Sequence, residues 1–489
     1  MKPRRTLGLV IALVLIWLVR PWLHPLVMLV VVAPLQLLFL LALIILIWQP
    51  LKSLGPIKAE RTSLANYTLK ATHPLSAKKT VWLMICIVAL IFGMSIEHQL
   101  RLTRTADTIT YQERTELPQF SPLRLTPKAV AERYAHDSFQ SPQEHLGDSQ
   151  IAMVDDKLQR VFPRLPDGAL LFFIRPLSGF VTVETDTLDR KVAIDNQSFR
   201  YAEGIGTFDN LYYQLNLKRY FVTYSAEPIY LKNEANEWVT VVPFITYKGF
   251  PLPVPTWGGV MVVTSDGSIT EYSADEVAAV PYLAGNRLYP KELSAYYAHS
   301  YSYKDGLLNN WFLHREQAEV VQLPGDETII HAPTTEGFKQ LVVAEPYGRS
   351  YGIYKIFIFD ATTGQREVIS YDQTTQLTGP VAAADYVKKE FPTYDWSTFS
   401  LAEPRPLIIN NELHWLLSII PNDAAGIAAT VVLNAHTNAV SKVTTAAELD
   451  ALLAHGITKI TTPVDQKSTV LERISNIQKE LDELKTLVQ

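Results

Sequence analysis

The residues from Leu26 to Trp48 form a stretch of 23 residues in which only Pro34 and Gln36 interrupt the apolar side chains. A helix of about 20 apolar residues crosses the hydrocarbon core of a bilayer. A second run, Val81 to Ile96, has 16 residues and reaches the lower length limit if its polar neighbours lie in the interface. We expect both runs to be transmembrane helices.

A third apolar run, Leu7 to Val19, is short, with 13 residues. We expect it to form the first arm of a tight hairpin that turns at Arg20-Pro21 and His24-Pro25. The alternative is a cleaved signal peptide, but no small-residue cleavage site follows before the next apolar run. The sequence therefore predicts a membrane anchor, residues 1–104, with two or three transmembrane helices.

The segment between Pro50 and Thr80 carries six Lys and Arg residues against the single acid Glu60. The positive-inside rule places such a loop in the cytoplasm. One span then separates it from everything that follows, so we expect a multi-pass protein of the cell membrane whose large C-terminal region is extracytoplasmic. Nucleic-acid binding by this loop is disfavoured because basic and aromatic residues do not alternate in it.

The charge balance of the chain changes at the end of the predicted membrane anchor. Residues 1–104 contain 12 Lys and Arg against 2 Asp and Glu, whereas the remaining residues contain 32 and 47. The acidic part is long enough for more than one domain. Cys86, inside the second predicted span, is the only cysteine of the chain, so apolar burial and not disulfide bonds must stabilise the exposed part.

The exposed part repeats itself. PKAVAERYAH begins at Pro127 and PKELSAYYAH at Pro290, and a duplicated domain explains such copies better than catalysis does. We interpret residues 126–288 and 289–456 as two ectodomain repeats, preceded by a linker at 105–125. Three further pairs follow the same order: GFVTVETDTLDRKVAID from Gly179 with YKIFIFDATTGQREVISY from Tyr354, AEPIYLKNEANEW from Ala226 with AEPRPLIINNELHW from Ala402, and GVMVVTSDGSITEYSADE from Gly259 with ATVVLNAHTNAVSKVTTAAE from Ala429.

Each repeat is predicted to start with a helix after its proline. Val130 with Tyr134, and Leu293 with Tyr297, lie four positions apart and should pack on a sheet. His136 and His299 should then point away from that sheet. We interpret these histidines as inherited from a shared ancestor, the alternative being a repeated binding feature.

Strands and turns fill the rest of each repeat. The runs LLFFI from Leu170 and QLVVA from Gln340 have the length of strands, and polar turns predict four hairpins. Capping boxes, Ser273 with Glu276 and Thr445 with Glu448, predict helical segments after them. The fold class is therefore α+β, with helices followed by antiparallel meanders.

The hairpin FIFDATTGQREVISY, Phe357 to Tyr371, joins two apolar strands through an Asp-containing turn, and three related hairpins occur elsewhere. This helix-then-meander pattern resembles the PepSY and cystatin-like group of small extracytoplasmic α+β domains, over four units between Thr126 and Thr445. The resemblance implies a module for binding or inhibition that is commonly anchored to a membrane, and not a catalyst.

Chemistry has little visible support in the sequence. No two of the eleven histidines have a metal-ligand spacing of three or four, and no nucleophile elbow, phosphate-binding loop or dinucleotide fingerprint occurs. Glu227 and Glu403 are interpreted as turn residues ahead of Pro228 and Pro404, and not as a general acid pair. We predict no catalytic residue, cofactor or metal.

Aromatic residues cluster at the end of the second predicted helix and just after it. One interpretation is that this cluster stacks on a glycan or on a protein partner. Besides the tyrosines named below, it contains Tyr297, Trp311 and Phe312. The alternative is that the tyrosines are half-buried where the helix meets its sheet. The residues predicted for partner binding are Tyr296, His299, Tyr301 and Tyr303.

The C-terminal residues 470–489 follow a polar linker at 457–469 and repeat apolar residues every three or four positions. This pattern is typical of a coiled coil, so we expect a homo-oligomer; docking on the ectodomain or on another protein are the alternatives. The residues predicted for oligomerisation are Val470, Ile474, Ile477, Leu481, Leu484 and Val488.

The sequence as a whole favours a non-enzymatic, membrane-anchored binding or scaffold protein. Its expected partners are the lipid bilayer, an envelope protein or glycan, and further copies of the chain, but not nucleic acid. Two other classes stay open: a subunit of a membrane-spanning secretion or conjugation apparatus, and a cell-wall-acting enzyme with a site assembled from distant residues.

Overall fold

The computed structural model describes residues 3–53, 57–61, 67–71, 77–323, 328–348, 352–372, 375–443 and 445–455. The predicted linker at 457–469 and the predicted coiled-coil residues lie outside this set. The chain separates into two compact parts, an N-terminal part, Met1–Val381, and a C-terminal part, Ala382–Gln489.

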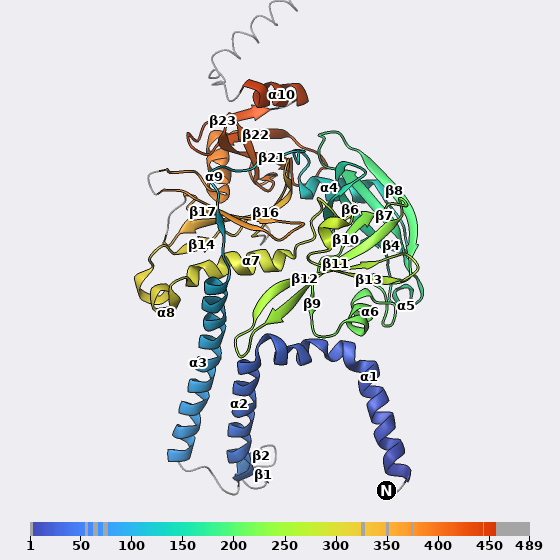
Figure 1. Cartoon of the computed structure of the whole chain (residues 1–489), viewed down its shortest axis with the longest axis vertical. Helices are drawn as coiled ribbons and strands as arrows, with labels where there is room; N and C mark the ends of the chain where they lie inside the picture. The colour runs from blue at the N-terminus through green and yellow to red at the C-terminus, as the bar shows by residue number, and fades with distance from the viewer. Residues whose placement is uncertain are drawn as a thin grey trace, which may run out of the picture. The chain divides into compact units, whose positions relative to one another are not determined.

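Three helices and a small hairpin precede the sheets (Figure 1). One described helix, at Thr80–Thr108, is long and apolar enough to cross a membrane. A bent pair, Trp17–Val32 with Pro34–Trp48, passes the same test only if the pair is counted as one span. The elements are α1 (Pro3–Val32), α2 (Pro34–Ser53), β1 (Ile57–Arg61), β2 (Tyr67–Ala71) and α3 (Ala77–Thr108).

The predicted single helix from Leu26 to Trp48 is wrong, because the chain bends by 104° at Ala33. Pro34 lacks an N–H and disfavours helical geometry in the residue before it, so the helix ends there and α2 begins. The predicted hairpin turn at Pro21 and Pro25 is also wrong. Helix α1 continues through both prolines and changes direction along its length (Figure 1).

Four antiparallel sheets share one topology, and we call each sheet with its preceding helix a module. In every module the first two strands both pair with the long third strand, and the fourth and fifth strands continue as a meander. The first module contains α4 (Lys128–Ser138), β4 (Glu144–Leu146), β5 (Gln150–Val154), β6 (Lys157–Pro166), α5 (Leu171–Ile174), β7 (Leu177–Glu184) and β8 (Val192–Phe199).

The second module follows directly and ends in a 3-10 turn. Its third and fourth strands are long, and their pairing contains a bulge between Phe244 and Ile245. Its elements are α6 (Leu211–Lys218), β9 (Thr223–Tyr224), β10 (Ile229–Lys232), β11 (Trp238–Lys248), β12 (Val254–Val263), β13 (Ile269–Ser273) and η1 (Val277–Ala279).

The third module gains a sixth strand from far away in the sequence. The segment after α3 forms β3 (Gln112–Glu113), which pairs in parallel with the last strand of this sheet. Arg114 then forms ion pairs with Glu336 (2.6 Å) and Glu367 (3.0 Å). The module's own elements are α7 (Lys291–Ser300), η2 (Tyr301–Tyr303), α8 (Gly306–Leu308), η3 (Asn309–Leu313), β14 (Ala318–Val320), β15 (Ile330–Thr334), β16 (Gly337–Pro346), β17 (Lys355–Asp360) and β18 (Arg366–Ser370).

All described residues of the C-terminal part belong to the fourth module. The first residues of its helix α9 precede the boundary at Ala382. Its interior is filled by aliphatic side chains around Trp415, which is 1 % exposed. Its elements are α9 (Pro380–Glu390), β19 (Phe399–Leu401), β20 (Arg405–Ile409), β21 (Glu412–Pro421), β22 (Ala429–Asn434), β23 (Val440–Val443) and α10 (Ala446–His455).

The paired sequence segments occupy equivalent places in this topology. The PKAVAERYAH and PKELSAYYAH segments form α4 and α7, and the segments from Gly179 and Tyr354 form β7–β8 and β17–β18. The other two pairs form β10–β11 with β20–β21, and β12–β13 with β22–β23. The four predicted hairpins and the packing faces of both helices are confirmed.

The capping box at Thr445 is confirmed, whereas the box at Ser273 is formed in part, because the Ser273 hydroxyl donates to the Glu276 carboxylate and does not accept the Glu276 N–H. The Ser273 N–H donates to Glu276 Oε2 (2.8 Å), and the Thr445 N–H and the Glu448 carboxylate are paired in the same way. The Glu448 N–H in turn donates to Thr445 Oγ1 (3.2 Å).

The strand predicted at Leu170–Ile174 is wrong. These residues form the short helix α5, and Leu170 is 71 % exposed. Short apolar runs do not distinguish a strand from a helix, and here the run has no sheet neighbour to pair with. Gly206 instead donates its N–H to the Phe172 carbonyl (2.7 Å), which fastens α5 to the segment before α6.

The first two modules share one continuous hydrophobic core. Phe180 of β7 lies between Tyr230 and Trp238 of the second module, with ring centroids 4.8 and 4.7 Å away. A second core, around Tyr297, Phe357 and Phe359 of the third module, also includes Ile245 of β11. The first three modules thus pack on one another through shared apolar clusters, and the polar positions of interest lie where modules meet.

Candidate functional site

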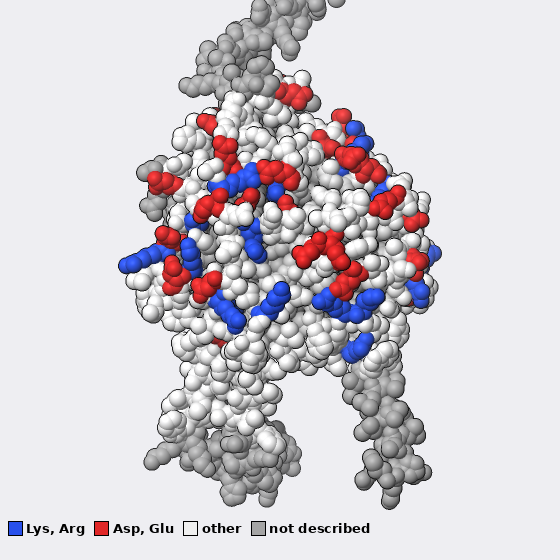
Figure 2. Space-filling model, in the orientation of Figure 1, with Lys and Arg blue, Asp and Glu red and all other residues white. Residues whose placement is uncertain are grey.

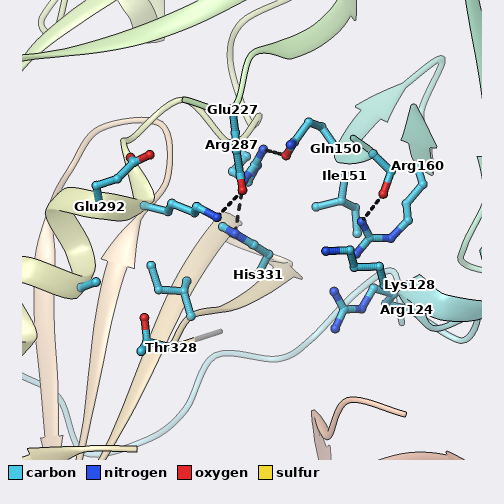
Figure 3. Close-up of a pocket in the computed structure, with 14 residues that line it drawn as sticks. Arg124, Lys128, Gln150, Ile151, Arg160, Glu227, Arg287, Glu292, Thr328 and His331 are labelled. Carbon is cyan, nitrogen blue, oxygen red and sulfur yellow. Dashed lines mark hydrogen bonds and ion pairs between the residues drawn. The ribbon is translucent and has the colours of Figure 1, made fainter. Parts of the chain in front are cut away.

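A cavity of about 400 Å³ lies where the first three modules meet (Figure 3). Its walls come from β5 and β6 of the first module, the segment before β10 of the second, and α7 and β15 of the third. This volume is within the range of small-ligand sites.

Both lysines of the repeated Pro-Lys motif line this cavity. Lys128 and Lys291 are the first residues of α4 and α7, directly after the N-cap residues Pro127 and Pro290. Because a helix start has a fixed geometry relative to the sheet below it, the duplicated motif delivers one ammonium group from each of two modules. The histidines of the same motif do not line this cavity, and both are exposed.

An ion-pair network crosses the middle of the cavity. Arg287 Nη1 donates to Glu227 Oε2 (3.4 Å), and Lys291 donates to the other oxygen of that carboxylate. Arg287 also donates to Gln150 of β5. Burial alone would raise the pKa of Glu227, but Arg287 and Lys291 hold it below its usual value. Glu227 is therefore an ionised bridge between modules, a role that the turn interpretation missed.

His331 of β15 is the least expected member of the site. Arg287 Nη1 lies 3.2 Å from His331 Nε2, and because a guanidinium can only donate, this ring nitrogen accepts. The proton is then on Nδ1, which is buried and has no hydrogen-bond partner among the described residues. Burial, with Arg287 and Lys291 nearby, lowers the pKa of His331 well below its usual value. The ring is thus neutral and offers one N–H.

Three further cations line the opposite wall: Arg124, Lys128 and Arg160 (Figure 3). Arg160 Nη1 donates to Ser149 Oγ (3.1 Å), and all three cations take part in further interactions. Across the cavity Glu292 accepts from Ser225 Oγ (3.0 Å). Among the described lining residues, five cations thus face two carboxylates.

The tyrosines predicted for partner binding lie elsewhere, beside α3. Tyr296 and Tyr301 are half-buried against the core of the third module, and Tyr301 lies over Phe357 at 5.2 Å. His299 is exposed, and its ring is 6.1 Å from that of the half-buried Tyr303. The structure brings the four residues together on α7 and η2, and their role in binding stays a prediction.

The described residues contain no group of three or more His, Cys, Asp or Glu side chains that could hold a metal ion. The cationic cavity, which no single sequence motif indicated, is the candidate site that combines charged side chains from three modules. Its only sequence signal was the repeated Pro-Lys and Glu-Pro pairs.

No family model matches the sequence, and none of the curated proteins is similar to it. The resemblance to PepSY and cystatin-like domains therefore stays a prediction based on the hairpins and their order.

Proposed function

We propose that the chain is a membrane-anchored extracytoplasmic binding or scaffold protein, which positions an envelope partner through its repeated α+β modules. In this proposal α1, α2 and α3 anchor the protein, the basic segment between α2 and α3 is cytoplasmic, and all modules are on the other side of the membrane. The repeated topology and the four paired sequence segments support an internal duplication, with residues 126–288 and 289–456 as its two copies.

The observation that carries the proposal is the cationic cavity. A site with two motif lysines and a neutral histidine N–H suits the recognition of an anion. The ligand class we infer is a carboxylate or phosphate group presented by an envelope protein or glycan.

The net negative charge of residues 105–489 limits the size of the anion that can bind. Residues 105–489 carry 32 Lys and Arg against 47 Asp and Glu, so a long polyanion would meet repulsion outside the cavity. A single anionic group that enters the cavity avoids that repulsion. A peptide carboxylate or a phosphate monoester of an envelope component fits this requirement.

The test uses the full-length protein in detergent and two probes, triglutamate and inorganic phosphate, titrated by calorimetry at low ionic strength. We expect saturable binding of at least one probe. Replacement of both motif lysines, Lys128→Gln with Lys291→Gln, should weaken it about tenfold or more, as expected for loss of two charge-assisted hydrogen bonds.

The matched control is Lys191→Gln, which removes an exposed lysine that pairs with Glu184 on β7. It should leave binding unchanged. Equal losses in the control and in the double variant would mean that the measured binding is general charge attraction, and no binding of either probe would refute the anion site.

Chemical crosslinking of intact cells separates this proposal from the apparatus alternative. A binding or scaffold protein should recover one main partner, and that partner should be lost in the lysine double variant. Several membrane proteins recovered in a fixed ratio, unaffected by the double variant, would instead indicate a subunit of a larger apparatus.

We further propose that the C-terminal heptads assemble the protein into a homo-oligomer. Ile477 and Leu484 occupy d positions of the predicted seam, where Asp would place charge in an apolar interface. The double variant Ile477→Asp with Leu484→Asp should reduce the mass measured by light scattering in detergent to that of one chain. A monomeric wild type would refute this assembly.

A further inference from the structure

Large apolar side chains are exposed in a few segments of the first three modules. Phe250 is 77 % exposed in the β11–β12 turn and Phe312 is 70 % exposed in η3. Phe173 of α5 and two residues that flank α6, Phe208 and Phe221, are all more than half exposed. We call these five residues the apolar rim.

The segments of the apolar rim contact α1 or α3, either directly or through a neighbouring segment. Trp22 of α1 contacts the Phe208 ring at 6.4 Å. Trp311, next to Phe312, donates its indole N–H to Gln99 of α3 (3.0 Å). The β11–β12 turn lies against α3, because the Arg104 guanidinium packs directly on Gly249.

The segments that carry the rim occupy the end of the N-terminal part at which the helices leave it. Figure 1 shows α5, α6, α8 and the β11–β12 turn at that end, around the upper ends of α1, α2 and α3. The remaining surface of these modules is mainly polar, so apolar exposure is concentrated where the helices emerge.

Basic residues border the same segments. Arg175 follows α5, Lys218 is at the end of α6, and Lys248 precedes the β11–β12 turn, and all three are exposed. On the face shown in Figure 2, the charged side chains nearest the helices are mostly Lys and Arg. Exposed aromatic residues next to cations are typical of surfaces that lie at the level of lipid headgroups.

We propose that the apolar rim is immersed in the interfacial region of the bilayer, so that the first three modules rest on the membrane and are not held away from it. The inference rests on the proposed membrane anchoring. A lipid occupant is favoured over a protein because the rim surrounds the helices, and the surface next to an emerging transmembrane helix faces headgroups.

The chain provides a direct way to test this proposal, because Cys86 is its only cysteine. In a Cys86→Ser background, single cysteines at Phe250 and Phe312 are labelled with a bimane fluorophore. The labelled full-length protein is reconstituted in nanodiscs of phosphatidylcholine and phosphatidylglycerol, with a doxyl quencher either near the headgroup or at the tail end of the acyl chain. Ile194→Cys, an exposed apolar position on β8, is the matched control.

We expect strong quenching at Phe250 and Phe312 by the quencher near the headgroup, weaker quenching by the tail-end quencher, and none at Ile194. Labels at both rim positions that water-soluble iodide quenches but lipid quenchers do not would overturn the proposal. Labels that neither agent reaches would also overturn it, because they would indicate a covering protein or a second copy.

Carbonate extraction of cell membranes distinguishes failure of the inference from failure of the proposed anchoring. If the wild-type protein stays in the membrane but its rim labels are not quenched by lipid, only the inference is wrong. If carbonate releases the protein, the anchoring is wrong and the rim proposal fails with it. Anion binding by the cavity is measured in detergent and is independent of both results.

Discussion

The helices α4 and α7 carry the same Pro-Lys and Tyr-Ala-His residues but have different surroundings. Helix α4 packs on β6, β7 and β8 of its own sheet. Helix α7 packs on β14 and β16 of its own sheet and also contacts α3 and β12. One copy therefore covers a single module, whereas the other connects α3, the second module and the third.

The side chains that differ between the copies account for this change. Ser294 and Tyr296 of α7 stand where α4 has Ala131 and Arg133. Tyr297, the shared tyrosine, donates its hydroxyl to the Pro255 carbonyl of β12 (2.6 Å). The comparison teaches that the two helices share their packing face and their lysine, while the neighbouring positions differ where α7 lies at a junction.

Truncation of the shared tyrosine should give the largest effect and test the difference directly. Tyr297 is 1 % exposed and Tyr134 is 8 % exposed. Tyr297→Ala should cost about 3–5 kcal/mol of unfolding free energy and Tyr134→Ala about half as much, since a less enclosed site loses less packing. Thermal unfolding of the detergent-solubilised protein measures both. Equal losses would show that α7 is no more of a junction than α4.

Exchange of the paired small residues should have the next largest effect. The Ser294 hydroxyl donates to Gln340 Oε1 (2.6 Å), and Ala131 is completely buried. Ser294→Ala removes a partner from a buried amide, and Ala131→Ser buries a new hydroxyl, so each should cost about 1–3 kcal/mol. The same unfolding measurement applies. A neutral Ala131→Ser would mean that α4 already has a polar neighbour at that position.

Acidification should weaken the junction next to α7. The pKa of His331 is lowered in the folded protein, mainly by burial, so the unfolded state binds the proton first. Its contribution is complete above the unfolded pKa of about 6.5 and is lost as the pH falls towards the folded value, by up to about 1.4 kcal/mol per pH unit. The melting temperature of His331→Gln should fall less between pH 7 and pH 5 than that of the wild type. Parallel curves would refute this assignment.

The smallest effect is expected at the exposed end of α4. Arg190 and Asp137 are 3.8 Å apart, and both side chains are more than 40 % exposed. Such pairs contribute about 0–1 kcal/mol, so Asp137→Asn should leave the melting temperature nearly unchanged. A large loss would show that α4, like α7, depends on contacts outside its own sheet.

Local features of the fold could be predicted from the sequence because they depend on neighbouring residues. The four hairpin turns and the capping box at Thr445 combine side chains a few positions apart and are confirmed, whereas the box at Ser273 is formed in part. The break at Ala33 was visible as Pro34 but was given less weight than the apolar run around it. Apolar length indicates membrane compatibility and not straightness.

The cationic cavity could not be predicted for the opposite reason. Lys128, Glu227 and His331 come from three modules, and only the packing of those modules brings them to one cavity. The repeated motif contains the lysine that lines the cavity, whereas its histidine, which has the more versatile chemistry, does not line it. Likewise, the apolar residues of α5 were predicted to form a strand, because a short apolar run alone does not distinguish a buried strand from an exposed helical turn.

The parallel pairing of β3 with β18 has a consequence for the order of synthesis. A ribosome delivers Gln112 and Glu113 about half a chain before their partners Glu367 and Val368. Domains generally fold as they emerge, so the first and second modules can form their sheets while β3 still has no neighbour. The strand that directly follows α3 is therefore among the last to pair, and a truncated chain that ends before β18 would leave β3 without its partner and open to chaperones and proteases.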